Sequence, residues 1–96
     1  MTTLHIFHKP PSDIASLQDC LRCLQEGDGL IFIEDGVYTA LNPSLESLPS
    51  HVSLYSLAPD VAARGLPERL SKEIELVDDA AFVRLCCQFD KSISWF

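Results

Sequence analysis

Basic side chains are scarce in this chain of 96 residues, which has seven Lys and Arg against 14 Asp and Glu and a formal net charge of −7. The basic residues are scattered as Lys9, Arg22, Arg64, Arg69, Lys72, Arg84 and Lys91. Binding to nucleic acid requires a basic face that displaces counterions from phosphate. Direct binding of DNA, RNA or an anionic membrane by this chain alone is therefore disfavoured.

Signals for secretion and for membrane insertion are also missing. The start of the chain, Met1 to His5, has neither the charged region nor the apolar run of a signal peptide. No segment approaches the ~20 apolar residues that a membrane span needs. We therefore expect a cytoplasmic protein. Because cytosolic thiols are normally kept reduced, its four cysteines are expected to be free.

No residue pattern indicates a cofactor. The three histidines share no metal-ligand spacing, and the adjacent Cys86 and Cys87 would diverge on a helix, so we expect no metal site. The segment Gly27-Asp28-Gly29 lacks the lysine and the spacing of a phosphate-binding loop. His8 and Asp35 each follow an expected strand, where they are interpreted as loop-capping and turn residues.

What the sequence does contain is a regular alternation of apolar segments within one domain, residues 1–96. The expected strands are Thr3–Phe7, Leu30–Ile33, His51–Leu57, Ile74–Val77 and, at the end, Ile93–Phe96. Ser12 or Asp13 is expected to cap the first helix. Further helices are expected over Val37–Leu41, over Pro59–Ala63, and from Asp78-Asp79 to about Phe89. Apolar strands that alternate with helices indicate an α/β fold with a mainly parallel sheet of four or five strands.

Two helices carry the cysteines. The apolar stripe expected in the first helix consists of Ile14, Leu17, Leu21 and Leu24. Cys20 flanks this stripe and Cys23 lies well off it. Both are in mid-helix, without help from the helix dipole, and at this spacing their Cβ atoms are about 5–6 Å apart, too wide for an easy disulfide. The residues alone indicate semi-buried, unreactive thiols.

The last helix and the C-terminus are unusually apolar for so small a domain, in which 47% of residues are hydrophobic. The core stripe expected in the last helix consists of Phe82, Leu85, Cys86 and Phe89. Exposed apolar surface on a small protein commonly marks an interaction site. The residues expected at such an interface are Cys23, Val83, Cys87, Trp95 and Phe96.

Several motifs resemble those of the TusB/DsrH family. They are Leu4-His5 with the Lys9-Pro10 turn, Glu34-Asp35-Gly36-Val37, Asp60-x-x-Ala63-Arg64-Gly65-Leu66, Asp79-x-x-Phe82-Val83-x-Leu85, and Trp95 next to the C-terminus. Each motif is short, but together they follow the expected order over nearly the whole chain. The resemblance implies the three-layer α/β/α fold of the DsrE/DsrF/DsrH group.

The resemblance also implies a function. Such proteins join TusC/DsrF-type and TusD/DsrE-type paralogues in a heterohexamer of two copies each, which relays persulfide sulfur. The relay serves either 2-thiolation of the wobble uridine of tRNA or dissimilatory sulfur oxidation, and the carrier cysteine belongs to the TusD/DsrE-type subunit. The resemblance therefore implies an accessory subunit that is not an enzyme on its own.

The place for a carrier thiol in this fold is the turn after the third strand, beside a helix N-terminus that lowers a thiol pKa. Here that turn reads Leu57-Ala58-Pro59-Asp60, without a cysteine. Cys20 matches a cysteine of several DsrH-type proteins, which makes it the candidate sulfur-handling thiol. A homo-oligomeric persulfide carrier using Cys20 is the alternative from a different class. A small-molecule- or nucleotide-binding module has only the generic fold in its favour.

Overall fold

The computed structural model describes residues 1–41, 48–66 and 73–95, and five parallel strands form a sheet in this part of the chain. The strands are β1 (Thr3–Phe7), β2 (Gly29–Phe32), β3 (Ser53–Leu57), β4 (Ile74–Val77) and β5 (Lys91–Trp95). Their order across the sheet is β4-β3-β2-β1-β5, and Phe7 lies between Phe32 of β2 and Trp95 of β5. The expected α/β class with a parallel sheet is confirmed.

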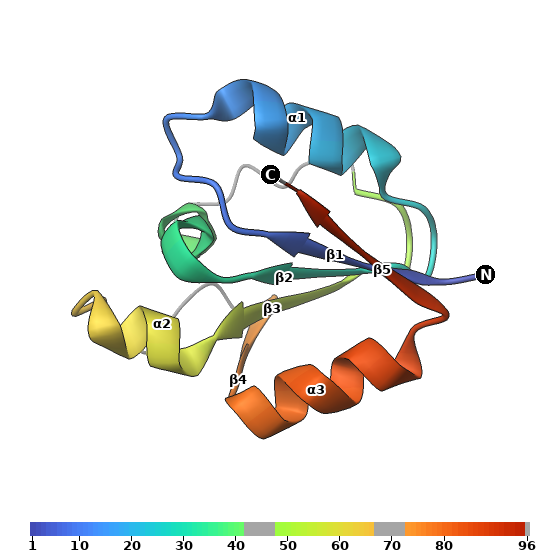
Figure 1. Cartoon of the computed structure of the whole chain (residues 1–96). Helices are drawn as coiled ribbons and strands as arrows, with labels where there is room; N and C mark the ends of the chain where they lie inside the picture. Colours follow the sequence, from blue (N-terminus) through green and yellow to red (C-terminus); the bar gives the residue numbers. More distant parts are fainter. Residues whose placement is uncertain (42–47, 67–72, 96) are drawn as a thin grey trace.

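The connecting helices are α1 (Ile14–Cys23), the 3₁₀ helix η1 (Glu34–Leu41), α2 (Ala58–Ala63) and α3 (Asp79–Gln88). Figure 1 shows α1 on one face of the sheet and α3 on the other. Aspartates cap both of these helices. Asp13 accepts a hydrogen bond from the backbone N–H of Ser16 at 3.1 Å, and Asp78 accepts one from Ala81 at 2.7 Å.

Two apolar clusters fill the space on either side of the sheet, because alternate side chains of a strand point to opposite faces. The cluster on the α1 face contains Phe7, Cys20, Leu24, Leu30, Phe32, Val37, Ala40, Leu54, Val61 and Ile74. The cluster on the α3 face contains Leu4, Ile31, Leu57, Val77 and Leu85. The sheet is thus covered on both sides, as the three-layer fold requires.

Several boundaries differ from the sequence expectation, among them those of β2, which spans Gly29–Phe32 and not Leu30–Ile33. The helix expected from Val37 begins earlier, at Glu34, and is of the 3₁₀ type. The third strand begins at Ser53, because His51 has a φ of 61° in the left-handed region, which an extended strand cannot contain. The last strand begins at Lys91, which pairs with Thr3 of β1. Phe96, the expected end of that strand, lies outside the described residues.

Two expected core positions were wrong. Ile14 is 61% exposed, because Leu17, Cys20, Leu21 and Leu24 form the inner face of α1 and Ile14 lies at its rim in the first turn. Cys86 is exposed although it was expected in the core. Leu85 is the buried centre of the inner face of α3, and the next residue points about 100° away from it.

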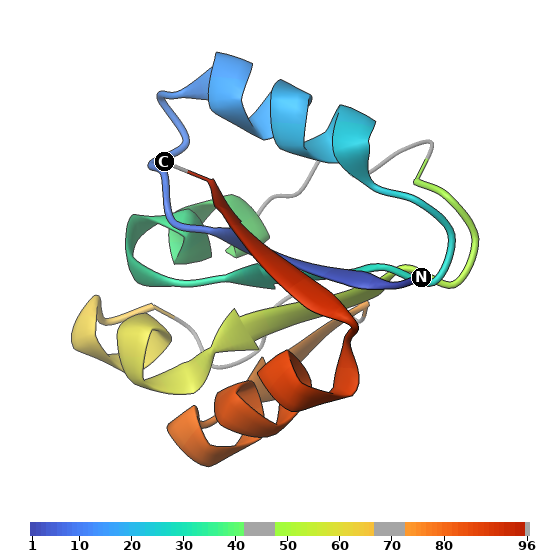
Figure 2. The same ribbon diagram turned by 45° about the vertical axis from the view of Figure 1, so that its right-hand side comes forward.

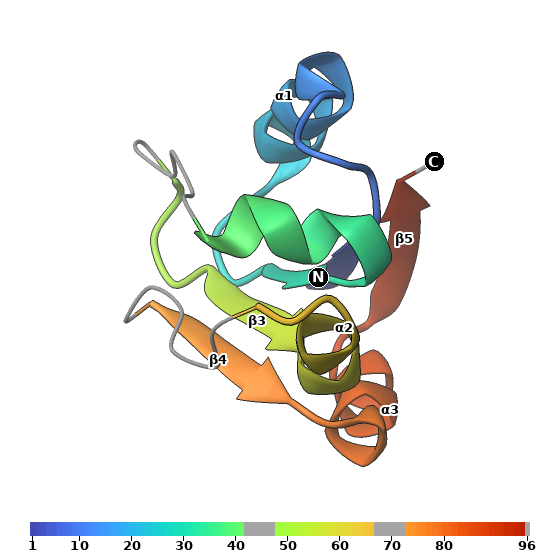
Figure 3. The ribbon, with the colours of Figure 1, turned by 90° about the vertical axis from the view of Figure 1, so that its left-hand side faces the viewer.

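The edge strand β5 and the carboxyl ends of the strands carry the hydrogen-bonded polar side chains described below. Figure 2 shows β5 at the near edge of the sheet, with α1 on one side and α3 on the other. Figure 3 shows η1 and α2 side by side at the end where the strands finish. None of the helices in the described ranges is long and apolar enough to cross a membrane.

Candidate functional site

The carboxyl edge of the sheet is where the fold brings together polar side chains from the segments that follow β1, β2 and β3. Asp60, in the first turn of α2, accepts a hydrogen bond from the backbone N–H of Glu34 at 2.6 Å. Glu34 has a φ of 49°, a conformation in which non-glycine residues are uncommon. The Asp60 carboxylate therefore holds the first residue of η1 in a strained conformation at this edge.

Arg64, just after α2, connects this helix to η1. Its Nε and Nη2 atoms donate to Oδ1 of Asp35 at 3.2 and 3.1 Å, and its Nη1 atom donates to the backbone oxygen of Asp60 at 3.3 Å. The Arg64 side chain is 23% exposed and that of Asp35 55%, so the bonds between them face water, whereas the bond to the backbone of Asp60 is partly buried. The result is a cross-linked polar cluster of Asp35, Asp60 and Arg64, which we call the edge cluster.

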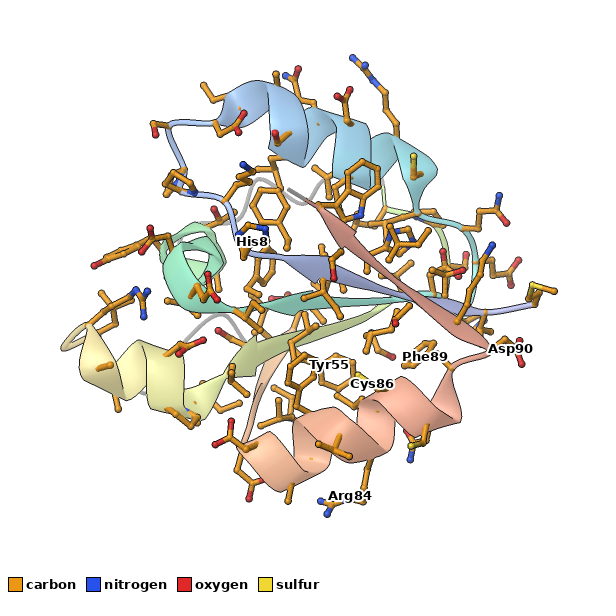
Figure 4. The ribbon with its side chains drawn as sticks, in the orientation of Figure 1. His8, Tyr55, Arg84, Cys86, Phe89 and Asp90 are labelled. Atoms are coloured by element: carbon orange, nitrogen blue, oxygen red, sulfur yellow. The ribbon has the colours of Figure 1, made fainter. Side chains whose placement is uncertain are left out.

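The turn into η1 needs glycine for a steric reason. A Cβ atom at Gly36 would overlap the carbonyl oxygen of Phe7, so only glycine allows η1 to pack this close to β1. The backbone N–H of Gly36 donates to the carbonyl of Ile33 at 2.9 Å. His8 lies nearby (Figure 4), with its Nδ1 atom 3.8 Å from a carboxylate oxygen of Glu34.

None of the four cysteines, all of which lie in the described ranges, is at this edge. Cys20 and Cys23 lie in the second half of α1, and Cys86 and Cys87 lie near the end of α3. Because these helices return from the carboxyl ends of the strands toward their amino ends, the thiols lie toward the opposite edge. The carboxyl edge thus offers carboxylates and a guanidinium but no sulfur nucleophile.

Cys20 is completely buried in the cluster on the α1 face. Burial, together with the neighbouring Cys23 thiol, raises the pKa of Cys20 to about 12. A thiol with so high a pKa is almost entirely protonated near neutral pH, whereas sulfur transfer needs the thiolate. This environment favours the interpretation of Cys20 as an unreactive core residue, and its part in sulfur handling remains a prediction.

The expected interface residues differ in exposure. Val83 is 63% exposed, and Cys23 and Cys87 are exposed as well. In Figure 4 Arg84 points away from the sheet, whereas Tyr55 and Phe89 lie between the sheet and α3. Trp95 is only partly exposed, because it packs against the cluster on the α1 face.

Sequence reasoning missed a partly buried chain of hydrogen bonds, the polar relay, between β5, β1 and the turn before β2. The indole Nε1–H of Trp95 donates to Nδ1 of His5 at 3.1 Å, and Nε2 of His5 lies 3.1 Å from Oδ2 of Asp28. Trp95 and His5 are 90 residues apart in the chain, and no short-range pattern relates them. Among the described residues, no three side chains of His, Cys, Asp or Glu are grouped so that they could hold a metal ion.

Solved structures with the same architecture define the class of fold. The ychN protein of Escherichia coli is similar with a TM-score of 0.73 and 16% identity, over 99% of this chain and 100% of that one. The solution structure of protein Tm0979 from Thermotoga maritima is similar with a TM-score of 0.68 and 23% identity, over 90% of this chain and 92% of that one. At these identities the likeness shows the fold alone.

The sequence comparisons are more specific. Residues 9–92 match the family described as DsrH like protein. The chain is also 40% identical over 97 residues to protein TusB of Escherichia coli strain K12, which covers 96% of this chain and 99% of the relative. Protein TusB of Escherichia coli O81 matches with the same identity and coverage. The chain belongs to the DsrH-like family, as its motifs indicated.

Proposed function

We propose that the chain is a non-carrier subunit of a heteromeric sulfurtransferase, in which TusC/DsrF-like and TusD/DsrE-like paralogues are its partners. Membership of the DsrH-like family relates it to sulfur relay. The observation that carries the finer proposal is the composition of the carboxyl edge. Where a carrier would need a thiol beside a helix, Asp35, Asp60 and Arg64 form the edge cluster.

The proposed role follows from charge and rigidity. The negative Asp60 in the first turn of α2 would oppose formation of a thiolate nearby, because it offsets the positive end of the helix dipole. The bonds from Arg64 and Asp60 fix the backbone of η1 and α2. Such an edge is suited to maintaining the shape of a complex while the sulfur travels on a partner's cysteine.

The pathway we propose is 2-thiolation of the wobble uridine of tRNA, in the cytoplasm and in a heterohexamer. It is supported by relatives that carry the name TusB. Dissimilatory sulfur oxidation is the alternative for the same kind of complex. A homo-oligomeric carrier that uses Cys20 is disfavoured by the complete burial of that thiol.

Persulfide mapping tests the non-carrier role. The isolated chain and its complex with both paralogues would each be incubated with a cysteine desulfurase and cysteine, and persulfides would be located by mass spectrometry. We expect the label on the TusD/DsrE-like paralogue and none on this chain, and a fourfold Cys→Ser variant of this chain should leave the transfer rate unchanged. Stoichiometric persulfide on this chain, or a transfer rate that falls in the Cys20→Ser complex, would contradict the proposal.

A further inference from the structure

The relay from Trp95 through His5 to Asp28 determines which nitrogen of His5 carries a proton. The indole nitrogen of tryptophan only donates hydrogen bonds. Nδ1 of His5, 3.1 Å away, must therefore accept and be unprotonated, and Nε2–H then donates to Asp28. The neutral imidazole satisfies both partners at once. His5 is 2% exposed, so water does not substitute readily for either bond.

Asp28 is the fixed end of the relay. Burial would by itself raise its pKa, but hydrogen bonds from the backbone N–H groups of Thr3 and Gln25 and from His5 outweigh burial and lower it. Both N–H groups are 3.0 Å from carboxylate oxygens. Asp28 therefore stays ionised over the whole range in which histidines titrate.

A second proton on His5 cannot be accommodated without a change at Trp95. It would bind to Nδ1, where it would point at the indole N–H, so that two donors would face each other. The imidazolium would keep its bond to the Asp28 carboxylate, which becomes a charge-assisted bond. Protonation of His5 thus strengthens its hydrogen bond to Asp28 and abolishes its hydrogen bond to Trp95.

The charged groups around His5 come from each element that packs against it. A cavity of about 220 Å³ beside the relay is lined by Met1, Thr3, His5, Cys23, Gln25, Asp28, Lys91 and Ile93. The charged groups that line this cavity with His5 are the Asp28 carboxylate, the ammonium group of Lys91 and the amino group of Met1. The Cys23 thiol from α1 is uncharged when protonated.

We propose that the relay is a pH-dependent anchor for β5, in which neutral His5 holds Trp95 against the α1 face and protonated His5 releases it. Among the described residues, β5 is an edge strand that pairs on one side only, with β1. Its residues 91–94 are exposed, and Trp95 is the only one that reaches the core cluster. Loss of the bond to His5 therefore removes the side-chain hydrogen bond that fixes the end of β5. This device is independent of the sulfur relay proposed above.

Trp95 is the sole tryptophan, so its fluorescence reports the anchor directly. The emission and the acrylamide quenching of the full chain would be recorded from pH 8 to pH 5, with far-UV circular dichroism to verify that the fold persists. We expect a shift to longer wavelength and an increase in quenching of about twofold as the pH falls. His5→Gln, whose amide can accept from Trp95 and donate to Asp28 without titrating, should show neither change.

A matched control changes the other two histidines. The double variant His8→Gln, His51→Gln keeps His5 and should show the same transition as the wild type. Imidazole ¹⁵N shifts of the wild type give a readout that does not depend on the folding of any variant. At pH 7.5 they should show Nε2 protonated and Nδ1 unprotonated on His5. A doubly protonated ring at that pH, an unchanged emission down to pH 5, or an equal transition in His5→Gln would overturn the proposal.

Discussion

At the residue scale, burial controls what each cysteine can do. Cys20 lies in the core and has a pKa raised to about 12, whereas Cys23, Cys86 and Cys87 are exposed. Burial and the neighbouring Cys87 thiol also raise the pKa of Cys86. The thiolate is the reactive form of cysteine. The burial of Cys20 and its high pKa therefore both protect it from modification.

Alkylation measures this protection. In the folded protein at pH 8, we expect three thiols to be alkylated readily by iodoacetamide and Cys20 at least ~100-fold more slowly, because only about one thiol in 10⁴ is ionised four pH units below its pKa. Peptide mass spectrometry identifies each site, and the same protein in urea is the control in which all four should react. Modification of Cys20 as fast as Cys23 would refute its burial.

Asp28 is the residue whose loss we expect to destabilise the fold most clearly through hydrogen bonding. It accepts bonds from two backbone N–H groups and from His5. Asp28→Asn should lower the free energy of unfolding at pH 7 by about 2 kcal/mol, the size expected for buried bonds to a charged group. Urea denaturation measures it. Asp19→Asn, on the exposed face of α1, should change it by less than about 0.5 kcal/mol.

The same variant carries a pH prediction. The pKa of Asp28 is lower in the folded state than the ordinary value of about 3.9 in an unfolded chain. Its stabilisation is therefore complete above that ordinary value and is lost as the pH falls through the folded pKa. The stability difference between the wild type and Asp28→Asn should shrink below about pH 4. A difference that grows on acidification would contradict this assignment.

At the element scale, α3 presents one buried and one exposed face within a single turn. Leu85 is 7% exposed in the core of the α3 face, and Val83 is 63% exposed. Leu85→Ala should lower the free energy of unfolding by about 2–5 kcal/mol, as is usual for a buried leucine. Val83→Ala on the same helix should change it by less than about 0.5 kcal/mol. Thermal or urea unfolding compares the two, and equal effects would mean that α3 is rotated from its described position.

Side-chain hydrogen bonds between η1 and α2 stabilise both of these short helices. The Asp60 carboxylate accepts a hydrogen bond from the strained backbone of Glu34. The Arg64 guanidinium donates to the carboxylate of Asp35. These bonds connect residues 26 and 29 positions apart, so they act only once β2 and β3 are paired. The short α2 helix is thus stabilised by its contacts with η1 more than by its own length.

At the scale of the whole molecule, the exposed apolar surface on α3 is the feature that we expect to bind a partner. Val83 and Cys87 lie on the outer side of α3. Val83→Asp should reduce co-purification with the TusC/DsrF-like and TusD/DsrE-like paralogues at least ~10-fold, because a buried unpaired charge is strongly unfavourable in an interface. Its effect on the isolated chain should be small, because this position is already in water.

Ile14 provides the matched control for that surface. It is 61% exposed and also an apolar β-branched residue, but it lies on α1, on the opposite face of the sheet. Ile14→Asp should leave co-purification unchanged. If Ile14→Asp releases the paralogues and Val83→Asp does not, the interface lies on the α1 face and the present assignment is wrong. Size-exclusion chromatography of the complexes measures both variants under the same conditions.

The sequence by itself determined the class of fold and the family. Apolar segments, together with capping and turn residues, located the strands and helices of the described ranges to within a few residues, because the spacing of apolar residues reflects which faces of a strand or helix are buried. Ordered motifs such as Glu34-Asp35-Gly36-Val37 indicated the DsrH-like family. The absence of a thiol after β3 was also visible in the sequence alone.

Tertiary structure decided which side chains are buried and which distant ones meet. The angular position of Cys86 was misjudged and Cys20 proved to be completely buried, because burial depends on how a helix is rotated on the sheet. The bond between Trp95 and His5 depends on β5 returning beside β1. Such contacts arise only when strands from both ends of the chain pair, and no local pattern encodes that pairing.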